Sequence, residues 1–388
     1  MRALIVGGGI GGLAAAVALQ RVGIQVAVFE KAPHIIEVGT GLSLWSNAMV
    51  ALRRFGLEAA ALEAGSVIEQ TRTFLSTGEP FGSVDFAALG EKAGAPSICL
   101  HRATLQRLLL DAALNGDPRS VRTGRECTGF EADAAGVAAR FSDGSREHGD
   151  VLIGADGIHS VIRGQLFGSE RVRFGGYLAW RGIAEGASPL PEREALVVVA
   201  RGSQAGCFQC GERRLYWFLT RNAAPGSHAG PLGNRGEAIE CIKNWRVPFR
   251  SFVEATEEDA ILRNDIFDHP ARRVWGVGRV TFLGDAIHAT TPNLGQGACQ
   301  ALEDAVVLAD SLRRCASVEA GLRGYEARRR DRANFVIGQS WRIGTILQLT
   351  RPVGVWLRKV LGSTSWAQKR AERLFERLLR VDLPELGG

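Results

Sequence analysis

Five glycines surround one isoleucine in the segment Gly7–Gly12, and this segment most constrains what the chain can fold into. The apolar run Ala3–Val6 before it predicts a buried parallel strand, and the Ala-rich run Leu13–Val22 after it predicts a helix. A second apolar strand, Val26–Phe29, ends at Glu30, 18 residues beyond the last glycine. This G-x-G-x-x-G turn, with an acidic residue after the next strand, predicts a βαβ unit that binds a dinucleotide.

Each glycine of the turn has a physical task. Gly7 permits the tight turn, Gly9 lets the backbone approach a pyrophosphate, and Gly12 lets helix and strand pack closely. Together with Gly11 they begin a helix whose free N–H groups and positive potential attract phosphate. Glu30 can accept hydrogen bonds from a ribose diol. The motif alone does not separate FAD from NAD, but its place at the N-terminal end of the sequence favours FAD.

Composition indicates a soluble globular protein with a sizeable core, because 46% of the 388 residues are hydrophobic and 23% are charged. We expect one large or two medium domains, no membrane span and no signal peptide. The odd number of scattered cysteines, seven, argues against disulfides and for the cytoplasm. Cys207 and Cys210 form a C-x-x-C, but no second pair follows, so we expect two thiols in a strand and no metal site.

The net charge of +6 is unevenly distributed. From Arg313 to Arg380 there are 16 Lys and Arg against 5 Asp and Glu, so this end of the chain carries the basic surface. Such a region can indicate nucleic acid or an anionic membrane. We expect a solvated face and no nucleic-acid partner.

Further along the chain, helices are predicted at Ala48–Phe55, Arg102–Leu114, Gly236–Trp245 and Gly297–Leu312. Residues 71–96 predict hairpins outside the first sheet, and Val121–Glu147 predicts a β-meander. The region 172–272 is mainly β, and the end of the chain is helical with a break near Pro352. We therefore expect a nucleotide-binding domain of residues 1–70, 97–171 and 273–330. A substrate domain of residues 71–96 and 172–272 interrupts it, and C-terminal helices cover residues 331–388.

Two further segments carry a family resemblance. Gly154–Arg163, with the sequence GADGIHSVIR, closely resembles the D-G motif of class A flavoprotein monooxygenases. Gly284–Gly297, with the sequence GDAIHATTPNLGQG, resembles the second FAD motif of the same family. The resemblance covers essentially the whole chain and extends to salicylate, 3-hydroxybenzoate and urate hydroxylases and to zeaxanthin epoxidase. It implies a para-hydroxybenzoate hydroxylase-like α/β fold, in which a mainly antiparallel β substrate domain interrupts a Rossmann-like FAD domain, with C-terminal helices.

The resemblance also implies a set of FAD-binding residues. Asp285, at the end of a buried strand, can accept a hydrogen bond from a ribityl or ribose hydroxyl. Gly295, Gln296 and Gly297 open the next helix, whose N–H groups and dipole would stabilise negative charge on a reduced flavin. The remaining positions that align with family FAD contacts are Lys31, Leu42, Ser43, Arg102, Asp156, Gly157 and Ala298.

In the family, NADH or NADPH reduces FAD, and O₂ adds to give a C4a-hydroperoxyflavin. Its distal oxygen then hydroxylates or epoxidises a small aromatic or polyene-like substrate. Hydroxylation of a phenol is helped by a base or a polarising group, and His288 and Tyr216 are the candidates. For both, the alternative is a packed structural residue. Pro292 completes the catalytic candidates because it fixes a turn against the flavin ring.

The substrate side departs from the nearest relatives. Urate-hydroxylase-like members resemble this chain at Tyr216, but Gln204 occupies the position of their substrate-side arginine. An anionic substrate held by that arginine is therefore not expected. Arg181, in a Trp-Arg-Gly strand, either replaces the arginine or is structural.

The basic segment Gln339–Leu361 is amphipathic and contains Trp341 and Trp356. This pattern fits docking on a membrane surface. Similar helices in the family usually cover the domain junction, so we expect packing, in a monomer or a homodimer.

Alternative functions remain at this point. One is an FAD-dependent dehydrogenase or reductase without oxygen insertion, and another is a non-catalytic flavin-binding sensor or partner protein. A flavin halogenase is disfavoured because the W-x-W-x-I-P motif is absent.

Overall fold

A computed structural model describes residues 1–35, 39–168, 172–186 and 190–387. Five parallel strands form the sheet that the glycine-rich turn predicts, in the order β18-β12-β1-β2-β8. Their bounds are β1 (Arg2–Val6), β2 (Gln25–Phe29), β8 (Val121–Arg122), β12 (Val151–Gly154) and β18 (Val280–Phe282). The helices α1 (Ile10–Arg21), α5 (Arg102–Gly116) and α10 (Gly297–Arg314) pack together beside it.

The core of this layer explains why the sequence folds this way. Residues 3–5 of β1 and the alanines of α1 are fully buried, because small side chains let the helix lie close to the sheet. The register aligns Val6 with Phe29 on one side and with Gly154 on the other. The carboxyl ends of these strands therefore meet at one edge, where the glycine-rich turn, Glu30 and Gly284 follow.

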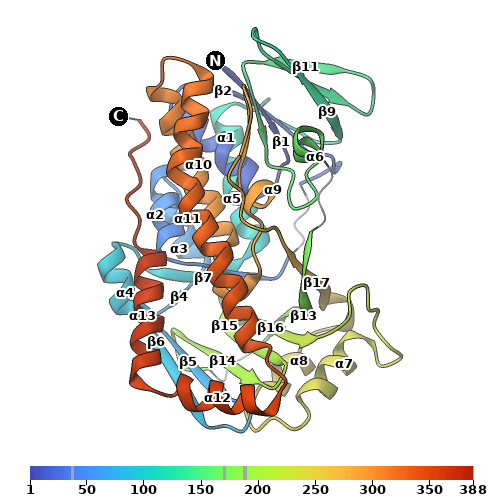
Figure 1. The fold of residues 1–388 in the computed structure, drawn as a ribbon, viewed down its shortest axis with the longest axis vertical. Helices are drawn as coiled ribbons and strands as arrows, with labels where there is room; N and C mark the ends of the chain where they lie inside the picture. The colour runs from blue at the N-terminus through green and yellow to red at the C-terminus, as the bar shows by residue number, and fades with distance from the viewer. Residues whose placement is uncertain (36–38, 169–171, 187–189, 388) are drawn as a thin grey trace.

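A second sheet of seven strands lies at the other end of the molecule (Figure 1). Its order is β17-β13-β16-β15-β14-β5-β6, and only the β5–β14 pair is parallel. The bounds are β5 (Gln70–Leu75), β6 (Pro80–Asp85), β13 (Arg173–Glu185), β14 (Glu194–Ala200), β15 (Ser203–Gln209), β16 (Arg214–Asn222) and β17 (Leu262–Asp268). The helices α7 (Gly233–Ile242) and α8 (Arg250–Glu254) bury one face of this sheet.

Two predicted segments differ from the structure. In residues 71–96 only β5 and β6 form a hairpin, while Phe86–Ala93 form the helix α4. Asp85 caps α4 by accepting a hydrogen bond from the Ala88 N–H at 2.9 Å, a capping signal that the prediction overlooked. In 121–147, β8 joins the parallel sheet, and the meander consists of β9 (Cys127–Ala132), β10 (Val137–Phe141) and β11 (Arg146–Gly149).

Smaller elements connect the two sheets. The strands β3 (Gly41–Leu44), β4 (Ser66–Ile68) and β7 (Ser97–His101) form a three-stranded sheet. The other helices before the C-terminal region are α2 (Ser46–Phe55), α3 (Glu58–Ala64), α6 (Val161–Phe167), α9 (Asp285–His288) and the 3-10 turns η1 (Glu258–Ala260) and η2 (Pro292–Leu294).

The end of the chain is helical, as predicted. The long helix α11 (Val318–Leu347) runs from the parallel sheet down to the seven-stranded sheet (Figure 1). Pro352 does more than end a helix, because it is the first residue of α12 (Pro352–Gly362). The helix α13 (Ser365–Leu379) follows. Within the described residues, no helix is both long enough and apolar enough to cross a bilayer.

Candidate active site

The glycine-rich turn has the geometry of a phosphate cradle. Gly7 has φ +111°, and a Cβ on it would lie 2.3 Å from the Ala155 carbonyl oxygen. A Cβ on Gly12 would lie 1.9 Å from the Gly7 oxygen, whereas a Cβ on Gly9 would meet nothing within 4 Å. Gly7 and Gly12 are therefore required by the protein's own packing, and Gly9 leaves open space at the start of α1.

Glu30 lies beside this turn. Its carboxylate accepts hydrogen bonds from the Gly8 N–H at 2.7 Å and from the Ala32 N–H at 2.9 Å, and it retains further acceptor capacity. Lys31, the next residue, is exposed. Gln106, which the prediction did not include, holds the turn from α5 by donating to the Gly8 oxygen at 3.1 Å.

Asp156 and Gly157 lie at the carboxyl end of β12. One Asp156 oxygen, Oδ2, caps α6 by accepting from the Val161 N–H at 2.8 Å. The other, Oδ1, is buried and has no hydrogen-bond partner among the residues that the structure describes. Burial raises the pKa of Asp156, which is the expected consequence of a desolvated carboxylate. Gly157 has φ +77° and forms part of the turn between β12 and α6.

Arg163 connects the two family-like segments, a role that sequence reasoning missed. Its guanidinium is buried and donates to the Ala286 oxygen at 2.5 Å and to the Ile158 oxygen at 2.6 Å. The arginine that ends the first segment thus fixes the position of the second.

Asp285 and Arg102 converge from distant parts of the chain. Asp285 begins α9 at the edge of the parallel sheet, and its side chain is exposed. Surrounding protein nevertheless desolvates it and raises its pKa, against the opposing positive charges of His288 and Arg102. Burial likewise lowers the pKa of Arg102, and Asp285 opposes that shift. Asp285 is thus accessible although protein surrounds it, and we call the space beside its carboxylate the hollow.

The start of α10 faces the same hollow. Gly295 has φ +62°, and a Cβ on it would lie 2.7 Å from Trp45 Nε1. A Cβ on Gly297 would lie 4.0 Å from the Asp285 carboxylate, so the helix start and this carboxylate are neighbours. The first N–H groups of the helix, including that of Ala298, have no partner within the helix. Pro292 begins the turn η2, which directly precedes α10. Leu42 and Ser43 lie on β3, and Cys299 of α10 approaches the Ser43 oxygen.

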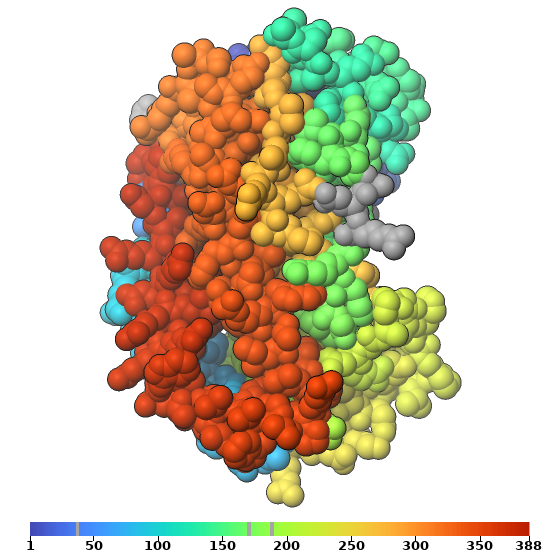
Figure 2. All heavy atoms as spheres, in the orientation of Figure 1, coloured from blue at the N-terminus to red at the C-terminus, as the bar shows by residue number. Residues whose placement is uncertain are grey.

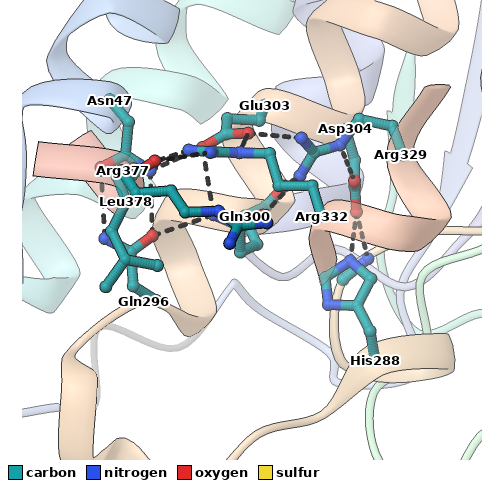
Figure 3. Close-up of polar contacts among 11 residues, drawn as sticks. Asn47, His288, Gln296, Gln300, Glu303, Asp304, Arg329, Arg332, Arg377 and Leu378 are labelled. Atoms are coloured by element: carbon teal, nitrogen blue, oxygen red, sulfur yellow. Dashed lines mark hydrogen bonds and ion pairs between the residues drawn. The ribbon is translucent and has the colours of Figure 1, made fainter. Parts of the chain in front are cut away.

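His288 does not join this hollow. It is 2% exposed, and its Nε2 lies 2.5 Å from Asp304 Oδ2. Asp304 also accepts hydrogen bonds from Arg329 Nε at 2.7 Å and from the Gly284 N–H at 3.0 Å (Figure 3). The Trp275 ring covers the imidazole at a centroid distance of 5.4 Å. This placement favours a structural role for His288 over a catalytic one.

The same buried network holds Gln296 and Glu303 (Figure 3). The Gln296 side-chain oxygen accepts from Asn47 and Gln300, both at 2.9 Å. Glu303 accepts from Asn47 at 2.6 Å and from Arg332 at 2.7 Å. Gln296 therefore turns its side chain into the protein and only its backbone toward the hollow. Sequence reasoning missed this network, and its signal was a pair of acidic residues on the inner face of α10.

Charge keeps the network ionised. Burial alone would raise the pKa of Asp304, but the charges of His288 and Arg329 lower it to about 2. The pKa of Glu303 is also lowered, because Arg329 and Arg332 outweigh the effect of burial. These ion pairs hold Gly284 and Gln296, at the two ends of the second segment, in fixed positions.

The substrate-side candidates share one face of the seven-stranded sheet. Arg181 is paired across strands with Phe218, and Gln204 is paired with Thr220, so their side chains point the same way. The rings of Phe208, Tyr216 and Phe218 add an apolar surface, with centroids 6.2–6.5 Å apart. We call this surface the substrate face.

Tyr216 lies where the substrate face meets the small sheet. A Cβ on Gly41 of β3 would lie 2.2 Å from the Tyr216 Cβ, so only glycine permits this approach. Burial raises the pKa of Tyr216 to about 12, although the charge of Arg181 and a hydrogen bond with Thr40 act in the opposite direction. The phenol is therefore neutral at physiological pH.

Arg181 and Gln204 differ in what they offer a ligand. Arg181 donates to Asn264 Oδ1 at 2.8 Å, and its buried Nε has no hydrogen-bond partner within the described part of the chain. Gln204 is 7% exposed and uncharged. Its neighbour Thr220 is held by Gln348, which donates from the end of α11 at 2.7 Å.

The C-x-x-C pair lies at and just beyond the end of β15. Cys207 lies in β15 and Cys210 directly follows it, and both are buried free thiols. Among the described residues, no three His, Cys, Asp or Glu side chains are grouped as a metal ion would need.

Together, the phosphate cradle, the second segment and the separate substrate face define a flavin-dependent oxidoreductase with a para-hydroxybenzoate hydroxylase-like fold. The chain belongs to the family described as FAD binding domain, which matches residues 1–340. FAD is its cofactor, and the open space at Gly9 and the unpartnered Asp156 oxygen fit that group.

Two relatives with assigned activities are similar over most of their length. The chain is 39% identical to aurachin C monooxygenase/isomerase of Stigmatella aurantiaca over 92% of each chain. It is 35% identical to an FAD-dependent urate hydroxylase of Klebsiella pneumoniae, covering 87% of this chain and 88% of that one. The crystal structure of Klebsiella pneumoniae HpxO complexed with FAD and uric acid superimposes with a TM-score of 0.90 at 30% identity, covering 98% and 96% of the two chains. The predicted fold, family and FAD cofactor are confirmed, and so is the prediction of an FAD-dependent monooxygenase.

Proposed function

We propose that this enzyme transfers one oxygen atom from O₂ to an uncharged, electron-rich organic ring and consumes NADH or NADPH. The neutral Gln204 on an aromatic substrate face carries this proposal. An anionic substrate would lack a cation at position 204, where a buried charge without a partner is costly, and Arg181 on the same face already donates to Asn264 Oδ1 at 2.8 Å. Monooxygenation itself is supported by the similarity to aurachin C monooxygenase and urate hydroxylase.

The flavin-side residues would hold and orient the cofactor. The cradle at Gly9 and the N-terminus of α1 would receive the pyrophosphate, with Glu30 on a ribose. Asp285 and Arg102, whose charges act on each other, would lie beside the flavin. When bound, FAD supplies hydride acceptance and oxygen activation. The start of α10 would stabilise negative charge that develops on the ring.

The substrate-side residues would position the ring and keep water away. The Tyr216 hydroxyl and Arg181 Nε would serve as hydrogen-bond donors to the substrate, beside the Gln204 amide. Because the phenol is neutral, Tyr216 orients or polarises the substrate and does not act as a phenolate base. Gln348 closes the far side of this face from α11.

Replacing Gln204 tests the claim that the substrate is uncharged. We expect Gln204→Arg to lower kcat/KM for an uncharged substrate about tenfold or more, because it buries a cation without a partner. The matched control is Gln204→Met, whose side chain has a similar length and no charge. It should lower kcat/KM less than Gln204→Arg does. Steady-state kinetics with compounds that stimulate NAD(P)H consumption measure both. A gain in kcat/KM for the uncharged substrate in Gln204→Arg would contradict the proposal.

The alternative, a dehydrogenase without oxygen insertion, predicts reduction or oxidation of the same compounds with no added oxygen. A non-catalytic flavoprotein predicts bound FAD and no product. Mass detection of the product separates all three.

We also propose the two-domain division at the boundaries predicted above, with the C-terminal helices from residue 331 joining the two parts. The enzyme is proposed to act in the cytoplasm, as a monomer or a homodimer.

A further inference from the structure

The helix α12 exposes apolar side chains that a helix in water normally buries. Val353, Trp356 and Leu361 are 69%, 60% and 58% exposed, and Leu357 and Val360 are also exposed. These positions follow the spacing i, i+3, i+4, i+7, i+8, which places all five side chains on one side of the helix. Trp366, at the start of α13, is 66% exposed. We call these six residues the apolar face.

The opposite side of α12 is firmly attached to the protein. Arg358 is buried and donates to the Ala200 oxygen at 2.8 Å and to the Leu347 oxygen at 2.6 Å. A Cβ on Gly362 would lie 2.3 Å from the Phe81 ring, so the helix end packs tightly on β6. The helix is therefore inverted, with Arg358 inside and the apolar face outside. Anchoring on the inner side means that a simple rotation cannot bury the apolar face.

Positive charge surrounds the apolar face. Between Asp331 and Glu372 the sequence contains no carboxylate side chain and seven Lys or Arg residues. Arg351 and Arg370 are exposed and flank the apolar face in the sequence, Arg370 stacks on Trp366 at 5.3 Å from its ring centroid, and Lys369 is exposed one residue before Arg370. Lys359 is exposed too but is paired with Glu79 at 2.5 Å. Tryptophan beside arginine and lysine is typical of segments that lie at a lipid headgroup boundary.

The location of α12 suits contact with a flat surface. It lies across the end of the molecule that is opposite the parallel sheet (Figure 1). Figure 2 shows the C-terminal helices covering this end, with a hollow among them. A surface cavity of about 440 Å³ lies between β5–β6 and the corner that joins α12 to α13, and its lining includes Phe81, Ser363 and Gln368.

We propose that the apolar face docks on the surface of an anionic lipid bilayer, with α12 lying in the headgroup plane. The five apolar positions would enter the acyl boundary, while the three exposed cations contact lipid phosphates. A second protein would need carboxylates opposite these cations as well as an apolar groove, whereas anionic lipid supplies both properties at once. This inference stands apart from the proposed oxygen transfer, because it depends on no residue of the flavin site.

Vesicle sedimentation of the FAD-loaded enzyme tests the proposal. We expect binding to phosphatidylcholine vesicles that contain phosphatidylglycerol, weaker binding to phosphatidylcholine alone, and loss of binding at high salt. The double variant Trp356→Glu with Leu361→Glu should bind at least about tenfold more weakly. The matched control is Leu232→Glu, because Leu232 is 61% exposed but lies in the α7 region. FAD content and Tm of each variant report folding.

A second variant keeps the test valid if the double substitution impairs folding. Arg351→Gln with Lys369→Gln leaves every apolar side chain in place and should weaken binding to the anionic vesicles by about 25-fold, at roughly fivefold for each of the two removed charges. Absence of vesicle binding by the wild type would overturn the proposal. So would equal binding by wild type and the folded double variant. A wild-type dimer that the double variant dissociates, without vesicle binding, would instead make this face a protein interface.

Discussion

Among single residues, the predicted site combines positions that the protein's own packing requires with positions that face open space. Gly7 and Gly12 are required by contacts within the protein, and Gly9 is the position that leaves space for something else. Asp285 likewise faces open space, whereas His288 is turned into a buried ion pair with Asp304. Residue type alone indicates the chemistry that is available, and only the direction of each side chain decides whether a ligand can reach it.

Alanine substitutions separate the two kinds of glycine. We expect Gly9→Ala to leave the urea stability of the FAD-free protein unchanged and to weaken FAD binding about tenfold or more, because its Cβ enters only the cofactor's space. Gly12→Ala should instead lower the free energy of unfolding by about 3 kcal/mol, since its Cβ collides with the Gly7 oxygen. Flavin fluorescence titration and urea denaturation check both. Full FAD affinity in Gly9→Ala would show that the pyrophosphate lies elsewhere.

Tyr216 gives a prediction in pH. Its pKa is raised to about 12, so the hydroxyl stays protonated throughout the working range and begins to ionise only in strong alkali. Tyr216→Phe should therefore lower kcat/KM up to about tenfold, the size of one hydrogen bond. The pH profile between about pH 6 and 10 should keep its shape, because no group that titrates there has been removed. Loss of an inflection in that range would make Tyr216 a base.

At the scale of elements, local signals were predictable and distant pairings were not. The βαβ unit followed from the glycine-rich turn, since strand, turn and helix lie within one short stretch. The parallel pairing of β5 with β14 was not predictable, because residues 70–75 and 194–199 are brought together only by the fold. The ion pairs between α10 and α11 were missed for another reason: no local pattern shows that Asp304 and Arg329 face each other until the two helices pack.

The coupling of α10 to α11 gives a prediction in acid stability. The pKa of Asp304 is lowered from 3.8 to about 2, so its charged form stabilises the fold above about pH 4 and this contribution is lost as the pH falls toward 2. Asp304→Asn should lower the free energy of unfolding by about 3 kcal/mol at neutral pH, because it leaves buried cations without their partner. The difference from the wild type should shrink between about pH 4 and 2. Chemical denaturation along a pH series measures it, and a constant difference would contradict the account.

At the scale of the whole molecule, α11 connects the flavin layer to the substrate face. In its last third, Ser340 contacts Thr291 of the second segment, with a hydrogen bond of 2.5 Å to the Thr291 oxygen. At its end, Gln348 donates to Thr220 and accepts from Asn222 at 2.9 Å through its backbone oxygen. One rigid helix thus fixes the distance between the two halves and closes one side of the site.

Removing the Gln348 side chain should open that side to water. We expect Gln348→Ala to bind FAD normally and to divert a larger share of NAD(P)H consumption to hydrogen peroxide, about twofold or more. Thr345→Ala is the control, because Thr345 is exposed on the same helix and bonds only within it. Peroxide and product are measured together. Unchanged coupling in Gln348→Ala would mean that the helix end does not seal the site.

The most direct test of oxygen transfer uses isotopically labelled O₂. The purified enzyme with FAD and NAD(P)H is screened for an uncharged ring compound that accelerates NAD(P)H consumption, and the product is then formed under ¹⁸O₂. We predict a product that is heavier by one oxygen atom and carries the label from O₂. A product that forms without oxygen, or whose added oxygen comes from water, would contradict monooxygenation by this protein.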